Sequence, residues 1–215
     1  MKISKQTLSI LKNFAAINQS IVLEKGHEVS TVSHAGNIFA RFKAPEDFPE
    51  EVPLYDLPEF LSALSLFQDS EQKFKKDHVV LSDGTQTLKY SYSESNVVTK
   101  APKIAEEQLA NPLGVFKLTH AELTNLIKAA PVCKADEIVF ESKDRKVSLK
   151  AHSKSKPDLN NYAVGIGGQC DSDFEVRLSF DSFKMIEDDY EISLYDSFIR
   201  FNNETAGLEY IIATE

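Results

Sequence analysis

The second half of this 215-residue sequence repeats the pattern of the first half. Near the start of each half, two leucines have the three-residue spacing of a helix: Leu8 with Leu11, and 115 residues later Leu123 with Leu126. Near the end of each half, a strand-like run occurs at 88–92 and again at 208–212. A unit of about 100 residues that occurs twice predicts two modules of one fold, and it favours a scaffold over a single catalytic cleft.

The charges are distributed unevenly along the chain. The formal net charge is −9, so the molecule as a whole repels nucleic acid at long range. Residues 1–23 nevertheless contain Lys2, Lys5 and Lys12 and no acidic residue, in a sequence that has 33. Any contact with DNA would therefore need charge that is segregated locally, and the N-terminus is the candidate region.

Hydrophobic periodicity predicts helix, strands, helix, strands in each half. In the first half we expect a helix from Ser4 to about Asn18 and a second helix that begins after Asp56. We expect a loop over Pro45–Pro53. The predicted strands lie at 20–23, around Val29, at 38–42, and in a hairpin over 79–92.

The second half has the same predicted order. Thr119 caps a helix that Pro131 is expected to interrupt or end, and a short helix is expected from Ser179 or Asp181 through Ile186. The lysine-rich segment 153–158 is expected to be an exposed loop. The predicted strands lie at 138–140, 147–149, 162–164, 192–194, 198–201 and 208–212. We therefore divide the chain into an N-terminal module (1–92), an interdomain connector (93–114) and a C-terminal module (115–215).

The first helix carries a stripe of basic or small side chains. On a helical wheel, Leu8, Leu11 and Ala15 form the buried face, and an adjoining stripe holds Lys5, Ser9, Lys12 and Ala16. The second module has a less basic version of this stripe, in which His120, Thr124 and Lys128 lie along one face of the predicted helix. Such a stripe suits phosphate contact without sequence readout, although a merely solvated lysine face is the alternative.

No motif in the sequence predicts an enzyme or a cofactor. The patterns of P-loop nucleotide sites, zinc proteases and serine hydrolases are missing, and the two cysteines lack ligand spacing. We expect no catalytic residue, no metal and no cofactor. No apolar stretch is long enough to cross a membrane. Acidic residues in turns could be assembled on paper into a metal site, namely Asp171, Asp173, Glu187, Asp188 and Asp189.

Three segments resemble the DNA polymerase sliding clamps of T-even-type bacteriophages. The N-terminal segments Met1–Lys5 and Leu11–Asn18 are the most specific part of the likeness. Tyr55-Asp56-Leu57 with the apolar positions up to Leu66, and the terminal run Glu209–Ala213, are similar as well. In length and order of elements the likeness covers essentially the whole chain.

This resemblance implies an α+β DNA clamp fold. Each of the two repeated modules would place two helices on one face of antiparallel sheet, and the modules would assemble into a closed ring around duplex DNA. Rings of this family have six modules, so a chain of two modules implies a homotrimer that is closed by heterologous contacts. By position, Lys5, Lys12, Lys128 and Lys184 would face DNA, without regard to base sequence.

The resemblance also implies partners. The family docks partner peptides in a groove near the connector and the C-terminal strand, which places this groove near Val97, Val98, Tyr210 and Ile212. The implied partners are the DNA polymerase, the clamp loader and late-transcription factors, in the cytoplasm of an infected bacterial host. We therefore predict a non-enzymatic processivity factor of phage DNA replication. The alternatives are a repeat-built structural or assembly protein of a virion and a metal-dependent nuclease.

Overall fold

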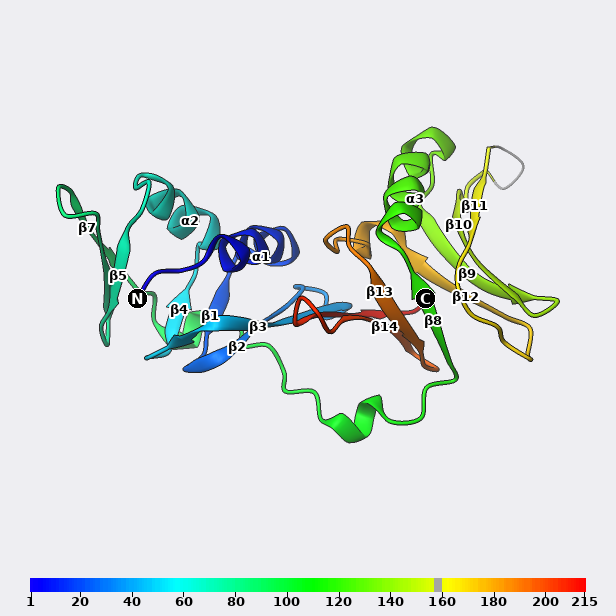
Figure 1. Ribbon diagram of the computed structural model, residues 1–215, viewed down its shortest axis with the longest axis horizontal. Coiled ribbons are helices and arrows are strands. Elements are labelled where there is room, and N and C mark those ends of the chain that lie inside the picture. The colour runs from blue at the N-terminus through cyan, green and yellow to red at the C-terminus, as the bar shows by residue number, and fades with distance from the viewer. Residues whose placement is uncertain (157–159) are drawn as a thin grey trace. The chain divides into compact units, whose positions relative to one another are not determined.

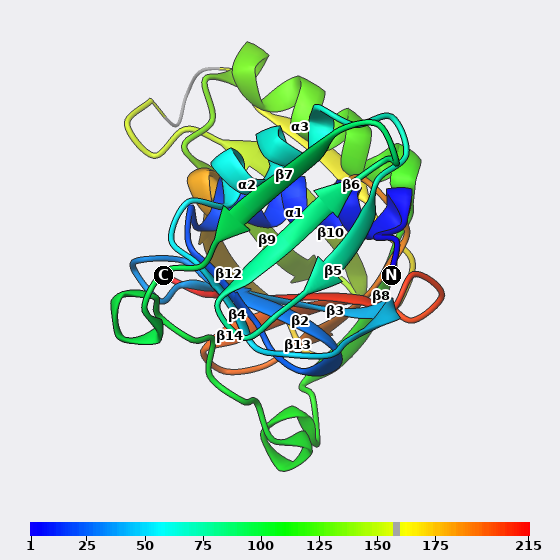
Figure 2. The same ribbon diagram turned by 90° about the vertical axis from the view of Figure 1, so that its left-hand side faces the viewer.

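A computed structural model describes residues 1–156 and 160–215, so Pro157 and Asp158 of the predicted lysine-rich loop lie outside the described residues. The chain forms two compact units, Met1–Lys103 and Ile104–Glu215 (Figures 1 and 2). The boundary between them falls inside the segment that we assign to the connector. The limits of that connector and of the two modules stay predictions.

The first unit contains the two helices that the sequence predicts. Helix α1 (Lys5–Ile17) begins after Ser4, whose hydroxyl accepts a hydrogen bond from the Thr7 N–H at 3.1 Å. Helix α2 (Leu57–Ser65) begins after Asp56, whose carboxylate accepts from the Glu59 N–H at 2.8 Å. The two helices pack against each other, α1 also packs on β2 and β3, and α2 packs on β7 (Figure 1).

The strands of this unit are all paired antiparallel. Strand β1 pairs with β4, β2 pairs with β3, and β5, β6 and β7 form a sheet in chain order (Figure 2). Their bounds are β1 (Ile21–Leu23), β2 (Gly26–Val32), β3 (Ile38–Phe48), β4 (Val52–Leu54), β5 (Glu71–Phe74), β6 (His78–Ser82) and β7 (Thr87–Ser91).

The prediction of a loop over Pro45–Pro53 was wrong except at residues 49–51, which connect two strands. Strand β3 continues through Pro45 to Phe48, and β4 includes Pro53. Ala44 and Phe48 are buried, so apolar contacts hold this segment in the sheet despite the prolines. Pro45 is tolerated because the pairing of β3 with β2 shifts register beside it, where no ladder hydrogen bond is required.

The second unit opens with the short 3-10 helix η2 (Glu106–Leu109), while η1 (Ser95–Val97) belongs to the first unit. Two sets of antiparallel strands follow. One set has β13 between β8 and β14, with β15 beyond β14; the other runs in the order β11-β10-β9-β12. Their bounds are β8 (Gly114–Leu118), β9 (Glu137–Lys143), β10 (Lys146–His152), β11 (Tyr162–Gly165), β12 (Phe174–Ser179), β13 (Tyr190–Leu194), β14 (Phe198–Asn203) and β15 (Leu208–Ala213).

Pro131 neither interrupts nor ends the helix of the second unit, contrary to our prediction. Helix α3 (His120–Cys133) has 14 residues, and it packs on β10 and β11 (Figure 1). Pro131 lies in the last turn, where a missing N–H removes only one helical hydrogen bond. The helix is capped by Lys134, whose backbone is left-handed with φ of 50°. The Lys134 N–H donates to the Pro131 carbonyl, and the Ala135 N–H donates to the Ala130 carbonyl.

The short helix expected from Ser179 or Asp181 through Ile186 is instead a single 3-10 turn, η3 (Phe180–Ser182). Beyond it, Phe183 and Met185 are buried and Lys184 between them is exposed, which is the alternation of an extended segment. The backbone of Ile186 bonds to tyrosine hydroxyls, because its N–H donates to Tyr210 and its carbonyl accepts from Tyr190. These contacts replace the hydrogen bonds of a short helix, whose nucleation is costly.

Candidate nucleic-acid interface

The outward face of α1 is the stripe that the sequence predicts. Lys5, Ser9, Lys12 and Ala16 are all exposed. The buried face differs in part from the prediction, because Leu8 and Ala15 are only half-buried, whereas Leu11 is fully buried as predicted. The buried residues of α1 are Thr7, Ile10, Leu11, Phe14 and Ile17.

Glu46 on β3 holds the first turn of α1 from the buried side. Its carboxylate accepts hydrogen bonds from the Thr7 hydroxyl at 2.6 Å and from the Ser4 N–H. Burial raises the pKa of the Glu46 carboxyl, but these hydrogen bonds outweigh burial and bring the pKa below its ordinary value of 4.5. Thr7 is fully buried, so this negative charge lies beneath the helix and away from the lysine stripe.

The stripe of α1 therefore presents positive charge to solvent. Among the residues that the structure describes, neither Lys5 nor Lys12 is in an ion pair, whereas nearby Lys2 pairs with Asp69 at 2.6 Å. The N-terminal strand-like segment is fixed as well, because the Met1 amine and the Ile3 N–H both donate to Gln72. A fixed helix with two exposed lysines can attract phosphates without reading bases.

The matching face of α3 has different electrostatics. Lys128 is exposed, but the other two members of the stripe, His120 and Thr124, contact the acidic turn before β13. The His120 N–H donates to the Asp189 carboxylate at 2.6 Å, and the His120 ring nitrogen Nδ1 donates to the Glu187 carbonyl at 2.9 Å. The Thr124 hydroxyl donates to the Glu187 carboxylate. Carboxylates thus lie on the stripe itself.

Lys184, the fourth residue predicted to face DNA, is exposed but does not lie on an α-helix. It follows η3, and its N–H donates to the Ser182 carbonyl at 2.9 Å. The role of all four lysines in DNA contact stays a prediction. The contact of the acidic turn with α3 gave no sequence signal, because Thr124 and Glu187 are 63 residues apart.

The acidic turns are engaged with protein groups. Asp171 pairs with Arg145 at 2.8 Å, and Asp188 accepts the N–H of Asp189. Across 1–156 and 160–215, no three His, Cys, Asp or Glu side chains are grouped so as to hold a metal ion. Over the same ranges, no helix is both long and apolar enough to cross a membrane.

The residues predicted to form a partner groove differ in accessibility. Val97 in the first unit is 54% exposed, whereas Val98 is buried. In the second unit, Tyr210 and Ile212 are fully buried; burial raises the pKa of Tyr210, and its hydroxyl accepts from the Ile186 N–H at 3.3 Å. The groove assignment stays a prediction.

Sequence reasoning missed two exposed apolar side chains at the start of the second unit. Leu113 is 61% exposed and Val115 is 49% exposed. The Leu113 N–H donates to the Leu194 carbonyl at 2.8 Å, which holds this segment along β13. The alternation over 114–118, with Phe116 and Leu118 buried, is the signal that could have identified β8 and its outward Val115.

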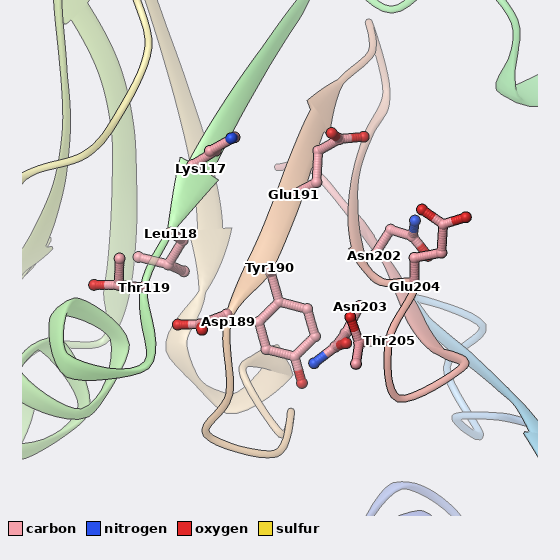
Figure 3. A pocket seen from close by; sticks show the side chains of 10 residues that line it. All are labelled: Lys117, Leu118, Thr119, Asp189, Tyr190, Glu191, Asn202, Asn203, Glu204 and Thr205. Carbon is pink, nitrogen blue, oxygen red and sulfur yellow. The ribbon is translucent and has the colours of Figure 1, made fainter.

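An open pocket of about 350 Å³ lies at the ends of β8, β13 and β14 in the second unit (Figure 3). Lys117, Glu191 and Asn202 are neighbours across these strands, and in Figure 3 they come from three separate strands. Tyr190 also lines the pocket; its side chain is buried, and its hydroxyl donates to the Ile186 carbonyl at 2.7 Å. The remaining lining residues are Leu118, Thr119, Asp189, Asn203, Glu204 and Thr205.

The two units with their helices and antiparallel sheets define a DNA clamp fold, and comparison with known structures agrees. The PCNA of A. fulgidus, described as bound to the C-terminal region of FEN-1, aligns with a TM-score of 0.73 at 16% identity, over 100% of this chain and 97% of that chain. At this identity the likeness shows the fold alone.

Sequence comparisons specify the family. Residues 3–100 match the family model described as DNA polymerase processivity factor. The sliding clamp of Vibrio phage KVP40 is 31% identical over 222 residues, which covers 100% of this chain and 99% of that protein. The sliding clamp of Escherichia phage RB69 is 25% identical over 225 residues, with 100% and 97% coverage. The chain belongs to the family of phage sliding clamps, the processivity factors of phage DNA polymerases.

Proposed function

We propose that three copies of this phage processivity factor close into a ring around duplex DNA and tether the replicative polymerase to it. The observation that carries this proposal is the exposed stripe of α1, with Lys5 and Lys12 and no carboxylate on the helix. In the proposal, each chain contributes the modules 1–92 and 115–215, joined by the connector 93–114. Three chains then supply the six modules of a closed ring.

A closed ring tethers by topology and not by affinity. It cannot leave the duplex sideways, so it keeps a bound polymerase at high effective concentration near the primer end. Two lysines on a helix give weak attraction that is blind to sequence and compatible with sliding. The remaining surface of a chain with net charge −9 disfavours DNA binding elsewhere.

We assign the DNA contact chiefly to Lys5 and Lys12, with Lys128 and Lys184 as secondary contacts. Lys5 and Lys12 lie on one rigid helix, whereas Lys128 lies one turn from Thr124 and its bound carboxylate. Lys184 follows a 3-10 turn. The attraction is therefore expected to be stronger at the first unit than at the second.

We propose that polymerase, clamp loader and late-transcription factors dock apolar peptide anchors beside the connector and the C-terminal strand, within the infected bacterium. The A. fulgidus PCNA is described as bound to the C-terminal region of FEN-1, which supports the binding of partners through such segments. Of the four groove residues, Val97 has an exposed side chain, whereas Val98, Tyr210 and Ile212 are buried. The exposed side chains of Leu113 and Val115 are further candidates for contact with partner peptides.

Retention on circular against linear DNA tests the proposal. The purified protein is loaded by its cognate loader onto nicked circles, and the circles are then linearised. We expect the protein to stay on circles and to be lost through free ends, because only a topological link depends on the ends. Equal retention on both forms would reject the ring. Light scattering supplies the second criterion, since the proposal requires the mass of three chains.

A further inference from the structure

Both units bind the first turn of their stripe helix with a carboxylate from elsewhere in the same unit, but from opposite sides. In the first unit, Glu46 accepts from the Ser4 N–H and from Thr7, which is fully buried. In the second unit, Asp189 accepts from the His120 N–H, and its neighbour Glu187 accepts from Thr124. Thr124 is only half-buried and Glu187 is exposed.

This difference decides whether the carboxylate lies near the basic stripe of its helix. The Glu46 carboxylate is under α1, so it supports the helix terminus without entering the Lys5–Lys12 stripe. The Glu187 carboxylate is bonded to a stripe residue. Positions four apart on a helix have Cβ atoms about 5–6 Å apart, so Thr124 places Glu187 within reach of Lys128.

Salt screens the interaction between the charges of Glu187 and Lys128 only in part. The Debye length at physiological ionic strength is about 8 Å, so the charge of Glu187 offsets part of the attraction of Lys128 for an approaching phosphate. His120, which takes the place of Lys5 after 115 residues, donates from its ring to the Glu187 carbonyl. The His120 ring is therefore directed toward the acidic turn.

We propose that Glu187 weakens the attraction of the α3 face for DNA, so that the α1 face of each chain carries the larger share of that attraction. This inference rests on the proposed DNA contact, and it adds a residue whose role is to weaken that contact at every second module. Alternating attractive and screened faces would lower the total attraction, which favours sliding over tight binding.

Glu187→Gln tests the inference, because glutamine keeps an oxygen that can accept from Thr124 while removing the charge. Affinity is measured by fluorescence anisotropy with a short labelled duplex over a salt series. We expect binding to tighten roughly twofold to fivefold at low salt, the range that exposed charge interactions reach. The matched control is Glu191→Gln, an exposed carboxylate of the same unit that lies on β13 and is not bonded to α3 among the described contacts.

The result that supports the inference is tightening for Glu187→Gln that clearly exceeds that for Glu191→Gln, with unchanged thermal unfolding. No change, or equal tightening in both variants, would overturn it, because the effect would then be absent or due to net charge. Retention of the wild type on circular DNA distinguishes a failure of the ring proposal from a failure of the role of Glu187. If the wild type is not retained, the ring proposal fails; if it is retained while Glu187→Gln binds as wild type does, only the role of Glu187 fails.

Discussion

Glu46 links a single carboxylate to the stability of the helix that carries the lysine stripe. Because its pKa is lowered in the folded state, Glu46 stabilises the fold above its ordinary pKa of 4.5, and this contribution is lost as the pH falls through the lowered folded value. We expect Glu46→Gln to lower the free energy of unfolding by about 1 kcal/mol at neutral pH, since it loses charge-assisted hydrogen bonds at a half-buried site. Urea unfolding over a pH series measures this.

The pH dependence is the distinguishing part of that experiment. The difference between wild type and Glu46→Gln should shrink as the pH falls from 4.5 through the lowered folded value, because the carboxylate takes up its proton first in the unfolded chain and then in the folded protein. Asp47→Asn is the control, since Asp47 is exposed on the same strand. A difference that stays constant down to acidic pH would show that Glu46 acts through packing and not through its charge.

At the same scale, periodicity was enough to place Lys5, Ser9, Lys12 and Ala16 on an exposed stripe. It could not show what touches that stripe. Glu46 lies 39 residues from Thr7, so no local pattern connects the two. The sequence pattern of a helix predicts which face is exposed. The electrostatics of that face depend on tertiary contacts, which the pattern does not contain.

At the scale of elements, the end of α3 holds a residue in a costly conformation. Lys134 is left-handed with φ of 50°, which an L side chain adopts at a cost of about 1–2 kcal/mol and glycine adopts freely. We expect Lys134→Gly to raise the free energy of unfolding by roughly 0.5–1 kcal/mol, after the entropy that glycine loses on folding. Thermal or urea unfolding of the intact protein measures it.

Lys134→Ala is the matched control, because it removes the same charge and keeps a Cβ at the left-handed position. It should give no gain in the free energy of unfolding. If alanine stabilised the protein as much as glycine, the benefit would come from the lost charge and the backbone argument would be wrong.

Helices and strands could be predicted where local pattern and capping agreed. Ser4, Asp56 and Thr119 each mark a real helix start, because a cap is a contact within one turn. The errors arose where tertiary contacts outweighed local preference. Phe48 is buried and keeps β3 extended through Pro45, and tyrosine hydroxyls hold Ile186 outside a helix.

At the scale of the whole molecule, a strongly acidic chain presents a basic stripe without carboxylates on one helix of its first unit. The internal repeat suggested this inequality, since the second stripe has His120 where the first has Lys5. The structure makes the inequality larger, because carboxylates of the acidic turn contact two members of the second stripe. Sequence duplication therefore predicts the architecture better than it predicts the distribution of charge.

The salt dependence of DNA binding should differ between paired variants of the two units. Each phosphate contact by a lysine contributes about 0.9 to the slope of log affinity against log salt. We expect Lys5→Gln with Lys12→Gln to reduce the slope by up to about 1.8 per chain in contact with DNA, because both lysines are exposed on a face without carboxylates. Lys128→Gln with Lys184→Gln should reduce it by less than half as much.

Anisotropy with a short duplex over a salt series gives both slopes, and light scattering checks that each variant keeps the mass of the wild type. The two double variants change the net charge equally, so a general effect of charge would alter both slopes by the same amount. Equal reductions would therefore contradict the asymmetry between the units. A reduction confined to the second pair would show that α3, and not α1, carries the DNA contact, since screening by Glu187 would then be too weak to offset Lys128.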